Sequence, residues 1–109
     1  MAGPNLPVDD VVINDEFDAR RDEARVGGEL AGVLEYRLAG TRRILVHTEV
    51  ATAFAGRGIG AALARHALDV AVRAGTRVTA KCPFVRSWLA RHPEYAASVT
   101  PDPRRRPRD

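Results

Sequence analysis

The sequence of 109 residues has little of several residue types, and each shortage excludes a class of protein. Its single cysteine, Cys82, cannot form a disulfide within the chain, which excludes a small secreted scaffold held by disulfides. No apolar run approaches the roughly 18 residues that a membrane-spanning helix needs. The N-terminus, MAGPNLPVDD, lacks the basic and apolar segments of a signal peptide. We therefore expect a soluble, cytoplasmic protein with no membrane partner.

Outside the C-terminus, the sequence also has little excess of charge of one sign. The formal net charge is +3, and much of the excess lies in residues 101–109, PDPRRRPRD. No aromatic residue accompanies these arginines, so we do not expect nucleic acid as a partner. The length is typical of one domain. We predict a folded domain over residues 11–99, a flexible lead-in over 1–10 and a disordered basic tail over 100–109.

The first half of the chain has the alternation and the turn residues of β-strands. Strands are predicted over residues 11–17, 30–38 and 42–50, with turns at 27–29 and 39–41. The charged segment 17–26 fits a strand or a helix. Simple alternation places five residues on one face of the second strand: Leu30, Gly32, Leu34, Tyr36 and Leu38. This half therefore predicts two to four antiparallel strands joined by short turns.

The second half changes to helical periodicity. Apolar residues recur every three or four positions from Ile59 to Ala74, which predicts a helix that Gly75 ends. A strand follows over 76–82, and then a second helix over 83–92 with Pro83 at its first position. The fold class is therefore α+β (α/β): a mixed, mainly antiparallel sheet, one helix after the central strand and a second C-terminal helix.

The stretch FAGRGIGAAL, residues 54–63, places glycines where a helix begins, which is typical of a phosphate-binding loop. A nucleoside triphosphate loop would need Gly-Lys followed by Ser or Thr, and Ile59-Gly60 stand there instead. A dinucleotide loop formally matches but needs an acidic residue after the next strand, where the chain has Lys81 and Cys82. A coenzyme A pyrophosphate loop needs only successive backbone N–H groups and the helix dipole, which residues 56–60 supply.

With its flanks, this loop resembles the acetyl-CoA loop of the GNAT acetyltransferase superfamily, whose pattern is Arg/Gln-x-x-Gly-x-Gly/Ala after a strand. The residues HTEV (47–50) and KCPFVRSWLARHPEY (81–95) are similar to those of the short YjdJ-like branch of that superfamily. The resemblance covers roughly residues 14–99. Ala55 departs from the pattern at its first position, which chiefly offers a backbone N–H.

The resemblance implies an acetyl-CoA-dependent N-acetyltransferase whose acceptor is an amine, on a small molecule or a protein. It also leaves open a non-catalytic module that binds or senses acyl-CoA. The pantetheine arm of acetyl-CoA is implied to run along Thr48, Glu49 and Val50 like an extra strand. The implied pyrophosphate site is made of six residues: Gly56, Arg57, Gly58, Ile59, Gly60 and Ala61. We assign no metal-binding residues.

Three residues are candidates for catalysis: His47, Cys82 and Glu49. Cys82 directly precedes a predicted helix, where the helix dipole favours a thiolate, so it is a candidate nucleophile; it fits pocket lining or the core as well. His47 suits a general base because histidine titrates near neutral pH, and Glu49 is the rival base. Alternation predicts Leu45, His47 and Glu49 on one face of their strand.

The part of the chain that would enclose the acceptor is shorter than in the superfamily that it resembles. Full-length members insert two helices between their first strands, whereas only ARRDEARVGGE, residues 19–29, lies there in this chain. That length suits a hairpin and not two packed helices. We therefore expect truncated N-terminal helices and an open acceptor site.

Overall fold

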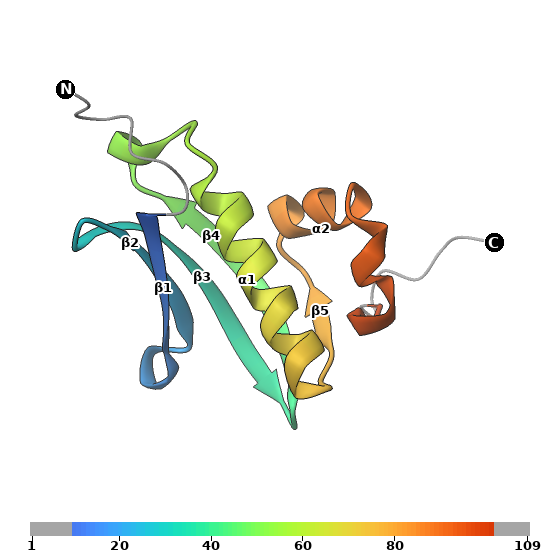
Figure 1. Cartoon of the computed structure of the whole chain (residues 1–109). Coiled ribbons are helices and arrows are strands. Elements are labelled where there is room, and N and C mark those ends of the chain that lie inside the picture. The colour runs from blue at the N-terminus through green and yellow to red at the C-terminus, as the bar shows by residue number, and fades with distance from the viewer. Residues whose placement is uncertain (1–9, 102–109) are drawn as a thin grey trace.

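The computed structural model describes residues 10–101, which form a five-stranded sheet and two α-helices (Figure 1). Both α-helices follow the fourth strand in the chain. The strands are β1 (Val11–Glu16), β2 (Arg21–Val26), β3 (Glu29–Ala39), β4 (Arg42–Val50) and β5 (Val78–Ala80). The helices are α1 (Ile59–Ala74) and α2 (Pro83–Ala90), with 3-10 turns η2 (Phe17–Ala19), η3 (Thr52–Phe54) and η4 (Pro93–Ser98). The segment 17–26, which fitted a strand or a helix, forms η2 and β2. A short turn therefore joins β1 to β2, in agreement with the hairpin expected in this region.

The sheet is mixed and mainly antiparallel, which confirms the predicted fold class. Strands β1 to β4 pair in chain order and antiparallel, and β5 joins the far side of β4 in parallel. The strand before α1 is therefore the fourth of five and not the central one. Pairing between β4 and β5 covers only residues 43–45 and 78–80. Beyond Leu45 these two strands separate, so the edge of the second half of β4 that faces away from β3 pairs with no strand among residues 10–101.

Two β-bulges overturn the predicted faces of β3 and β4. Ala31 is an extra residue opposite β2, and Val46 is an extra residue opposite β3. Each bulge reverses the in–out alternation that simple counting assumes. Leu30 is consequently exposed, and Leu45 is fully buried while the side chain of His47 is 55% exposed. The expectation that Leu45 shares a face with His47 and Glu49 is wrong for this reason.

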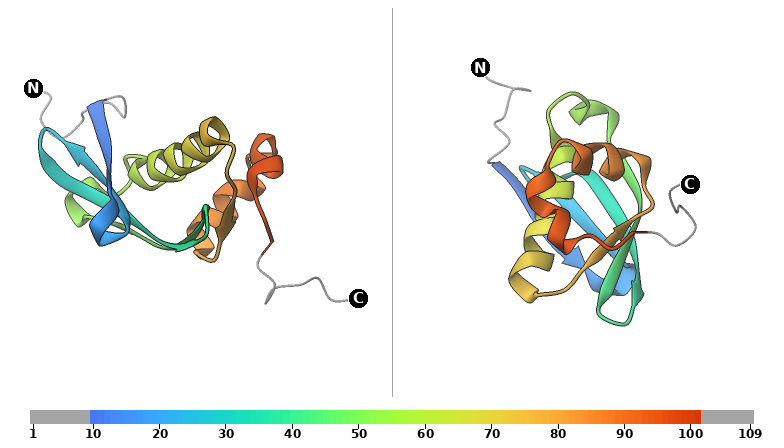
Figure 2. Two further views of the ribbon diagram at one scale, coloured as in Figure 1. Left: turned by 90° about the horizontal axis from the view of Figure 1, so that it is seen from below. Right: turned by 90° about the vertical axis from the view of Figure 1, so that its right-hand side faces the viewer.

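Helix α1 lies along one face of the sheet, and the core sits between them (Figure 2). The sheet meets α1 most closely at Gly32, where an added Cβ would lie 3.0 Å from Ile59 Cγ2 and 3.0 Å from the Glu49 carbonyl oxygen. Trp88 of α2 and Tyr95 of η4 extend the core beside α1. Within residues 10–101, no helix covers the other face of β1 to β4.

The C-terminal end of the described chain is tied to β5. The Thr100 N–H donates to the Val78 carbonyl oxygen at 2.7 Å, and the Thr79 hydroxyl donates to the Thr100 carbonyl oxygen at 3.0 Å. The ordered chain therefore reaches Thr100, one residue into the predicted tail. Residues 102–109 of that predicted tail and residues 1–9 of the predicted lead-in lie outside the described residues. Neither α-helix of residues 10–101 has the length and apolar character needed to cross a membrane.

Candidate active site

The glycine-rich loop forms an open N-terminus for α1, directly after β4. Gly56 and Gly58 have φ angles of 79° and 80°, in the left-handed region that glycine adopts at little cost. Gly58 precedes the first residue of the helix, and no side chain among residues 10–101 caps it. The first-turn N–H groups have no partner within the helix, and the helix dipole adds partial positive charge there. This loop can therefore bind an anion such as a pyrophosphate.

Two aromatic side chains hold this loop in place. Phe54 is buried, and the Arg57 guanidinium lies 5.1 Å from the centre of its ring. Phe84 of α2 packs on Gly60, where an added Cβ would lie 2.9 Å from Phe84 Cζ. The six predicted pyrophosphate residues, 56–61, are thus brought together at the start of α1. Thr48 and Val50 lie on the strand that leads into them.

A groove of about 550 Å³ runs from this loop between α1 and the α2–η4 segment. Gly58, Ala61 and Arg65 line it from α1, and Trp88 and Arg91 line it from the other side. Its walls carry basic and aromatic side chains and one carboxylate: the Arg65 guanidinium lies 5.3 Å from the Trp88 ring, and Asp69 lines the groove one helical turn beyond Arg65. Sequence analysis missed Arg65 and Arg91. The spacing of Ala61 and Arg65, one helical turn apart, was the available signal for Arg65.

Cys82 and Thr48 form one candidate pair, on the α1 side of β4. The Thr48 Oγ1 atom lies 3.3 Å from Cys82 Sγ, and Cys82 is 3% exposed. The Cys82 N–H donates to the Leu45 carbonyl oxygen at 3.0 Å, which fixes the thiol at the point where β4 and β5 separate. Cys82 is therefore buried but placed beside the strand along which the pantetheine arm is predicted to run.

His47 and Glu49 form a second pair, on the opposite side of β4. His47 Nε2 lies 3.4 Å from Glu49 Oε1, and both side chains are more than half exposed. They point away from Thr48 and Cys82, because neighbouring residues of a strand face opposite sides of the sheet. The structure therefore does not gather the three catalytic candidates at one point. It divides them between the two faces of β4.

A polar cluster under α1 was also missed by sequence analysis. The Arg43 guanidinium donates to Asp15 at 2.7 Å, and the Tyr36 hydroxyl donates to Asp15 at 2.6 Å. Asp22 is 2% exposed, and its Oδ1 atom has no hydrogen-bond partner among the described residues; Arg43 is 3.9 Å away. Burial and the charge of Asp15 raise the pKa of Asp22 to about 6, although Arg43 opposes them. Burial and the bond to Asp15 likewise raise the pKa of Tyr36 to about 12.

The fold and the loop define a GNAT-like domain, and comparison with known proteins agrees. Residues 21–99 match the family model described as GCN5-related N-acetyl-transferase. The chain is 35% identical to Protein NATD1 of Bos taurus, over 92% of this chain and 94% of that protein. It is 35% identical to Protein NATD1 of Homo sapiens, over 79% and 81% of the two chains, and 32% identical to that of Xenopus tropicalis, over 79% and 84%. The chain therefore belongs to the GCN5-related N-acetyltransferase family. Its place in the YjdJ-like branch stays a prediction.

Proposed function

We propose that this protein is an N-acetyltransferase that transfers the acetyl group of acetyl-CoA to an amine. The observation that carries the proposal is the open N-terminus of α1 directly after β4, within a chain of this family. The uncapped N–H groups there suit a pyrophosphate, and Gly56 leaves open space above the loop: an added Cβ would meet no atom within 4 Å. The residues present thus fit coenzyme A.

Each part of acetyl-CoA has a suitable surface beside this loop. The loop 56–61 would hold the pyrophosphate. The groove between α1 and α2 would hold the nucleotide, with Arg65 and Arg91 available to its phosphate. The second half of β4 offers an unpaired strand edge for the amides of the pantetheine arm, beside Thr48 and Val50. This path leads toward Cys82 at the separation of β4 and β5.

The protein's own residues would bind the two substrates and move one proton. Acetyl-CoA supplies an activated thioester carbonyl. The acceptor ammonium first loses a proton to His47 or Glu49, and its nitrogen then attacks the carbonyl carbon. A carbon–nitrogen bond forms and the carbon–sulfur bond breaks, while the nitrogen loses a second proton and the released thiolate takes up one proton. The exposed position of His47 and Glu49 allows the proton to leave to solvent.

A covalent route through Cys82 is the alternative within the same function. The Cys82 thiolate would take the acetyl group first and pass it to the amine in a second step. Intact-mass measurement after incubation with acetyl-CoA distinguishes the routes, with Cys82→Ser as the control. An acetyl adduct on the wild-type protein that is absent from the variant would support the covalent route. Full turnover by Cys82→Ser would exclude it.

Ligand-induced thermal stabilisation tests the proposed donor. A ligand that binds only the folded state raises the melting temperature by mass action, so acetyl-CoA should stabilise the protein while NAD and ATP should not. Selective stabilisation by NAD or ATP would overturn the proposal. Gly56→Ala should reduce the shift with acetyl-CoA, because its methyl group would stand over the phosphate site.

Gly40→Ala is the matched control for that variant. Gly40 has a φ of 64° and, like Gly56, no atom within 4 Å of an added Cβ. Both variants therefore carry the same kind of backbone strain, and both should melt earlier than the wild type. Only Gly56→Ala should also lose stabilisation by acetyl-CoA. Equal losses in the two variants would place the donor elsewhere.

A further inference from the structure

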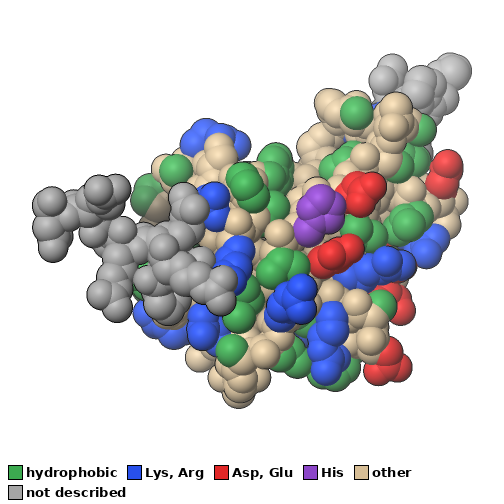
Figure 3. Space-filling model, turned by 180° about the vertical axis from the view of Figure 1, so that it is seen from behind, with side chains coloured by type: hydrophobic (Ala, Val, Ile, Leu, Met, Phe, Trp, Pro, Cys, Tyr) green, Lys and Arg blue, Asp and Glu red, His purple; other side chains and the backbone are tan. Residues whose placement is uncertain are grey.

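The face of the sheet opposite α1 carries a dense set of charged side chains. Figure 3 views the molecule from behind and shows acidic and basic side chains gathered over the strands on this side. The strand register places Arg21 and Glu23 of β2, Glu35 of β3, and His47 and Glu49 of β4 on this outer face. No helix of residues 10–101 covers this face, so a ligand can approach it.

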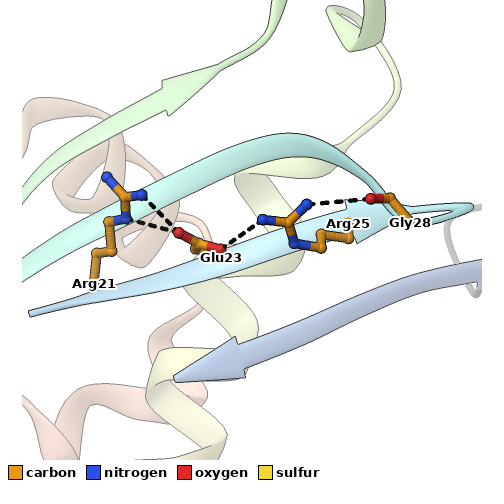
Figure 4. Close-up of polar contacts among 4 residues, drawn as sticks. All are labelled: Arg21, Glu23, Arg25 and Gly28. Carbon is orange, nitrogen blue, oxygen red and sulfur yellow. Dashed lines mark hydrogen bonds and ion pairs between the residues drawn. The ribbon is translucent and has the colours of Figure 1, made fainter. Parts of the chain in front are cut away.

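Most of the charge on β2 is already neutralised. Arg21 and Arg25 both form ion pairs with Glu23, at 2.7 Å and 3.1 Å, and Arg25 also donates to the Gly28 carbonyl oxygen (Figure 4). Glu23 is 7% exposed and lies between the two guanidinium groups. This carboxylate is therefore satisfied within the protein and is not free to bind a partner.

The carboxylates on β3 and β4 differ from Glu23 in this respect. Within the described part of the chain, no lysine or arginine nitrogen lies within 4 Å of the Glu35 or Glu49 carboxylate. Among the described residues the Glu49 carboxylate forms an ion pair with His47 alone, and Glu35 lies directly opposite His47 in the strand register. Directly opposed residues have Cβ atoms about 5 Å apart. Two carboxylates without a lysine or arginine ion pair among the described residues thus lie beside the candidate general base, although Arg21 lies directly opposite Glu35 on the β2 side.

Glu35 and Glu49 border two adjoining hollows that differ in charge. One, of about 260 Å³, is lined by Glu35 and Glu49 over an apolar floor that includes Leu30 and Val33; Arg21 also lines it, but its charge is paired with Glu23. The other, of about 530 Å³, is also lined by Glu35 but contains Arg20 and Arg37. Neither guanidinium forms an ion pair with a carboxylate among residues 10–101. The two hollows meet at Glu35, so acidic and basic surface lie side by side.

The basic hollow is held in place by the turn between β1 and β2. The Arg20 backbone lies in the left-handed region with a φ of 56°, and its carbonyl oxygen accepts the Tyr36 N–H at 2.9 Å. The Arg20 guanidinium stacks 4.2 Å from the centre of the Phe17 ring and donates to the Phe17 carbonyl oxygen at 2.6 Å. These contacts orient the guanidinium without neutralising its charge.

We propose that the acceptor binds on this outer face and is a primary amine in an acidic setting, such as a lysine next to aspartate or glutamate in a protein segment. The ammonium would lie between Glu35 and Glu49, beside His47, and an acidic group of the same acceptor would lie by Arg20 and Arg37. This inference rests on the proposed N-acetyltransferase function. It adds the class of acceptor and the side of the sheet from which the acceptor approaches.

The strand geometry allows this approach. His47 and Thr48 are neighbours on β4, so the outer-face base and the Thr48–Cys82 pair lie on opposite sides of one strand. Pairing between β4 and β5 ends at Leu45, two residues before His47. An amine on a flexible side chain can therefore pass the free edge of β4 and reach the thioester after His47 or Glu49 has removed its proton.

The test uses the full chain, acetyl-CoA and three lysine peptides that differ only in their flanks: acidic, neutral or basic. Release of free thiol measures kcat/KM, and fluorescence anisotropy measures peptide binding directly. The wild type should prefer the acidic-flanked peptide. Glu35→Gln should lower kcat/KM for it about two- to fivefold, the range for one exposed charge pair, with an unchanged KM for acetyl-CoA. Arg37→Glu should shift the preference toward the basic-flanked peptide.

Glu94→Gln is the matched control, because Glu94 is exposed on η4, away from both hollows. It should behave as the wild type with all three peptides. Turnover without flank preference, or a preference unchanged in Glu35→Gln and Arg37→Glu, would overturn this inference and leave the proposed function standing. Absence of both acetyl-CoA stabilisation and turnover would overturn both. If acetyl-CoA binds without turnover, absence of flank-dependent peptide binding would still refute the proposed acceptor site.

Discussion

Replacement of Asp22 by asparagine should raise the stability of the protein at neutral pH. Asp22 lies under α1 with 2% exposure, and one of its carboxylate oxygens has no hydrogen-bond partner among the described residues. Its closest cation, Arg43, is 3.9 Å away and is already bonded to Asp15. Because the negative charge of the Asp22 carboxylate is so poorly compensated, the folded state favours the protonated form of this group. The asparagine of the variant would keep the shape of the side chain and remove the charge.

The magnitude follows from the shift in the pKa of Asp22, from an ordinary 3.8 to about 6. Each pKa unit corresponds to 1.36 kcal/mol, so the shift is worth about 3 kcal/mol. The folded-state pKa is raised, so the folded protein binds this proton more tightly than the unfolded chain does. The Asp22 contribution to stability is therefore fully present below the unfolded pKa of 3.8 and is lost as the pH rises through about 6.

Urea unfolding, followed by the fluorescence of Trp88, measures this effect in wild type and Asp22→Asn from about pH 4 to about pH 8. The informative quantity is the difference in unfolding free energy between the two proteins at each pH. The asparagine amide shifts this difference by the same amount at every pH, so it does not alter the way in which the difference varies with pH. We expect the variant to gain up to about 3 kcal/mol on the wild type between the acidic and the neutral end.

Glu23→Gln, one residue along the same strand, is a control of opposite sign. Hydrogen bonds from Arg21 lower the pKa of Glu23, and those from Arg25 add to the effect, although burial opposes it. The stabilising contribution of Glu23 is therefore present above its unfolded pKa and is lost as the pH falls. The wild type should lose its advantage over Glu23→Gln on acidification. A difference for Asp22→Asn that does not change with pH would refute the reasoning.

Two further predictions concern packing and the donor site. Gly32→Ala should lower the unfolding free energy by about 1–3 kcal/mol in urea, because its Cβ would meet Ile59 and the Glu49 backbone at 3.0 Å; an unchanged midpoint would contradict this contact. Arg65→Ala should weaken acetyl-CoA binding about tenfold by calorimetry, because a charged hydrogen bond to phosphate is lost. Arg73 is exposed on the same helix and lies outside the groove, so Arg73→Ala should leave the affinity for acetyl-CoA unchanged. Equal affinity of the wild type and both variants would show that the groove does not bind the donor.

Much of the fold could be predicted because it depends on local patterns. Strand β4 and helix α1 begin and end where alternation, helical periodicity and Gly75 place them. The glycine-rich turn before α1 was equally predictable, because glycine is favoured where the backbone is left-handed, as at Gly56 and Gly58. Strand faces were predicted wrongly at Leu30 and Leu45. A bulge depends on how two strands pair, which the alternation of one strand does not reveal.

The sequence by itself determined the elements, the glycine loop at the start of α1 and the similarity to an acetyl-CoA-binding family. These follow from neighbouring residues, whose spacing is the same in any fold. Only the tertiary structure decided that Cys82 lies beside Thr48, on the face of β4 opposite His47 and Glu49. It alone placed Asp22 without a partner under α1, and Glu35 opposite His47 on an uncovered face. These relations join residues far apart in the chain, and strand pairing and burial create them.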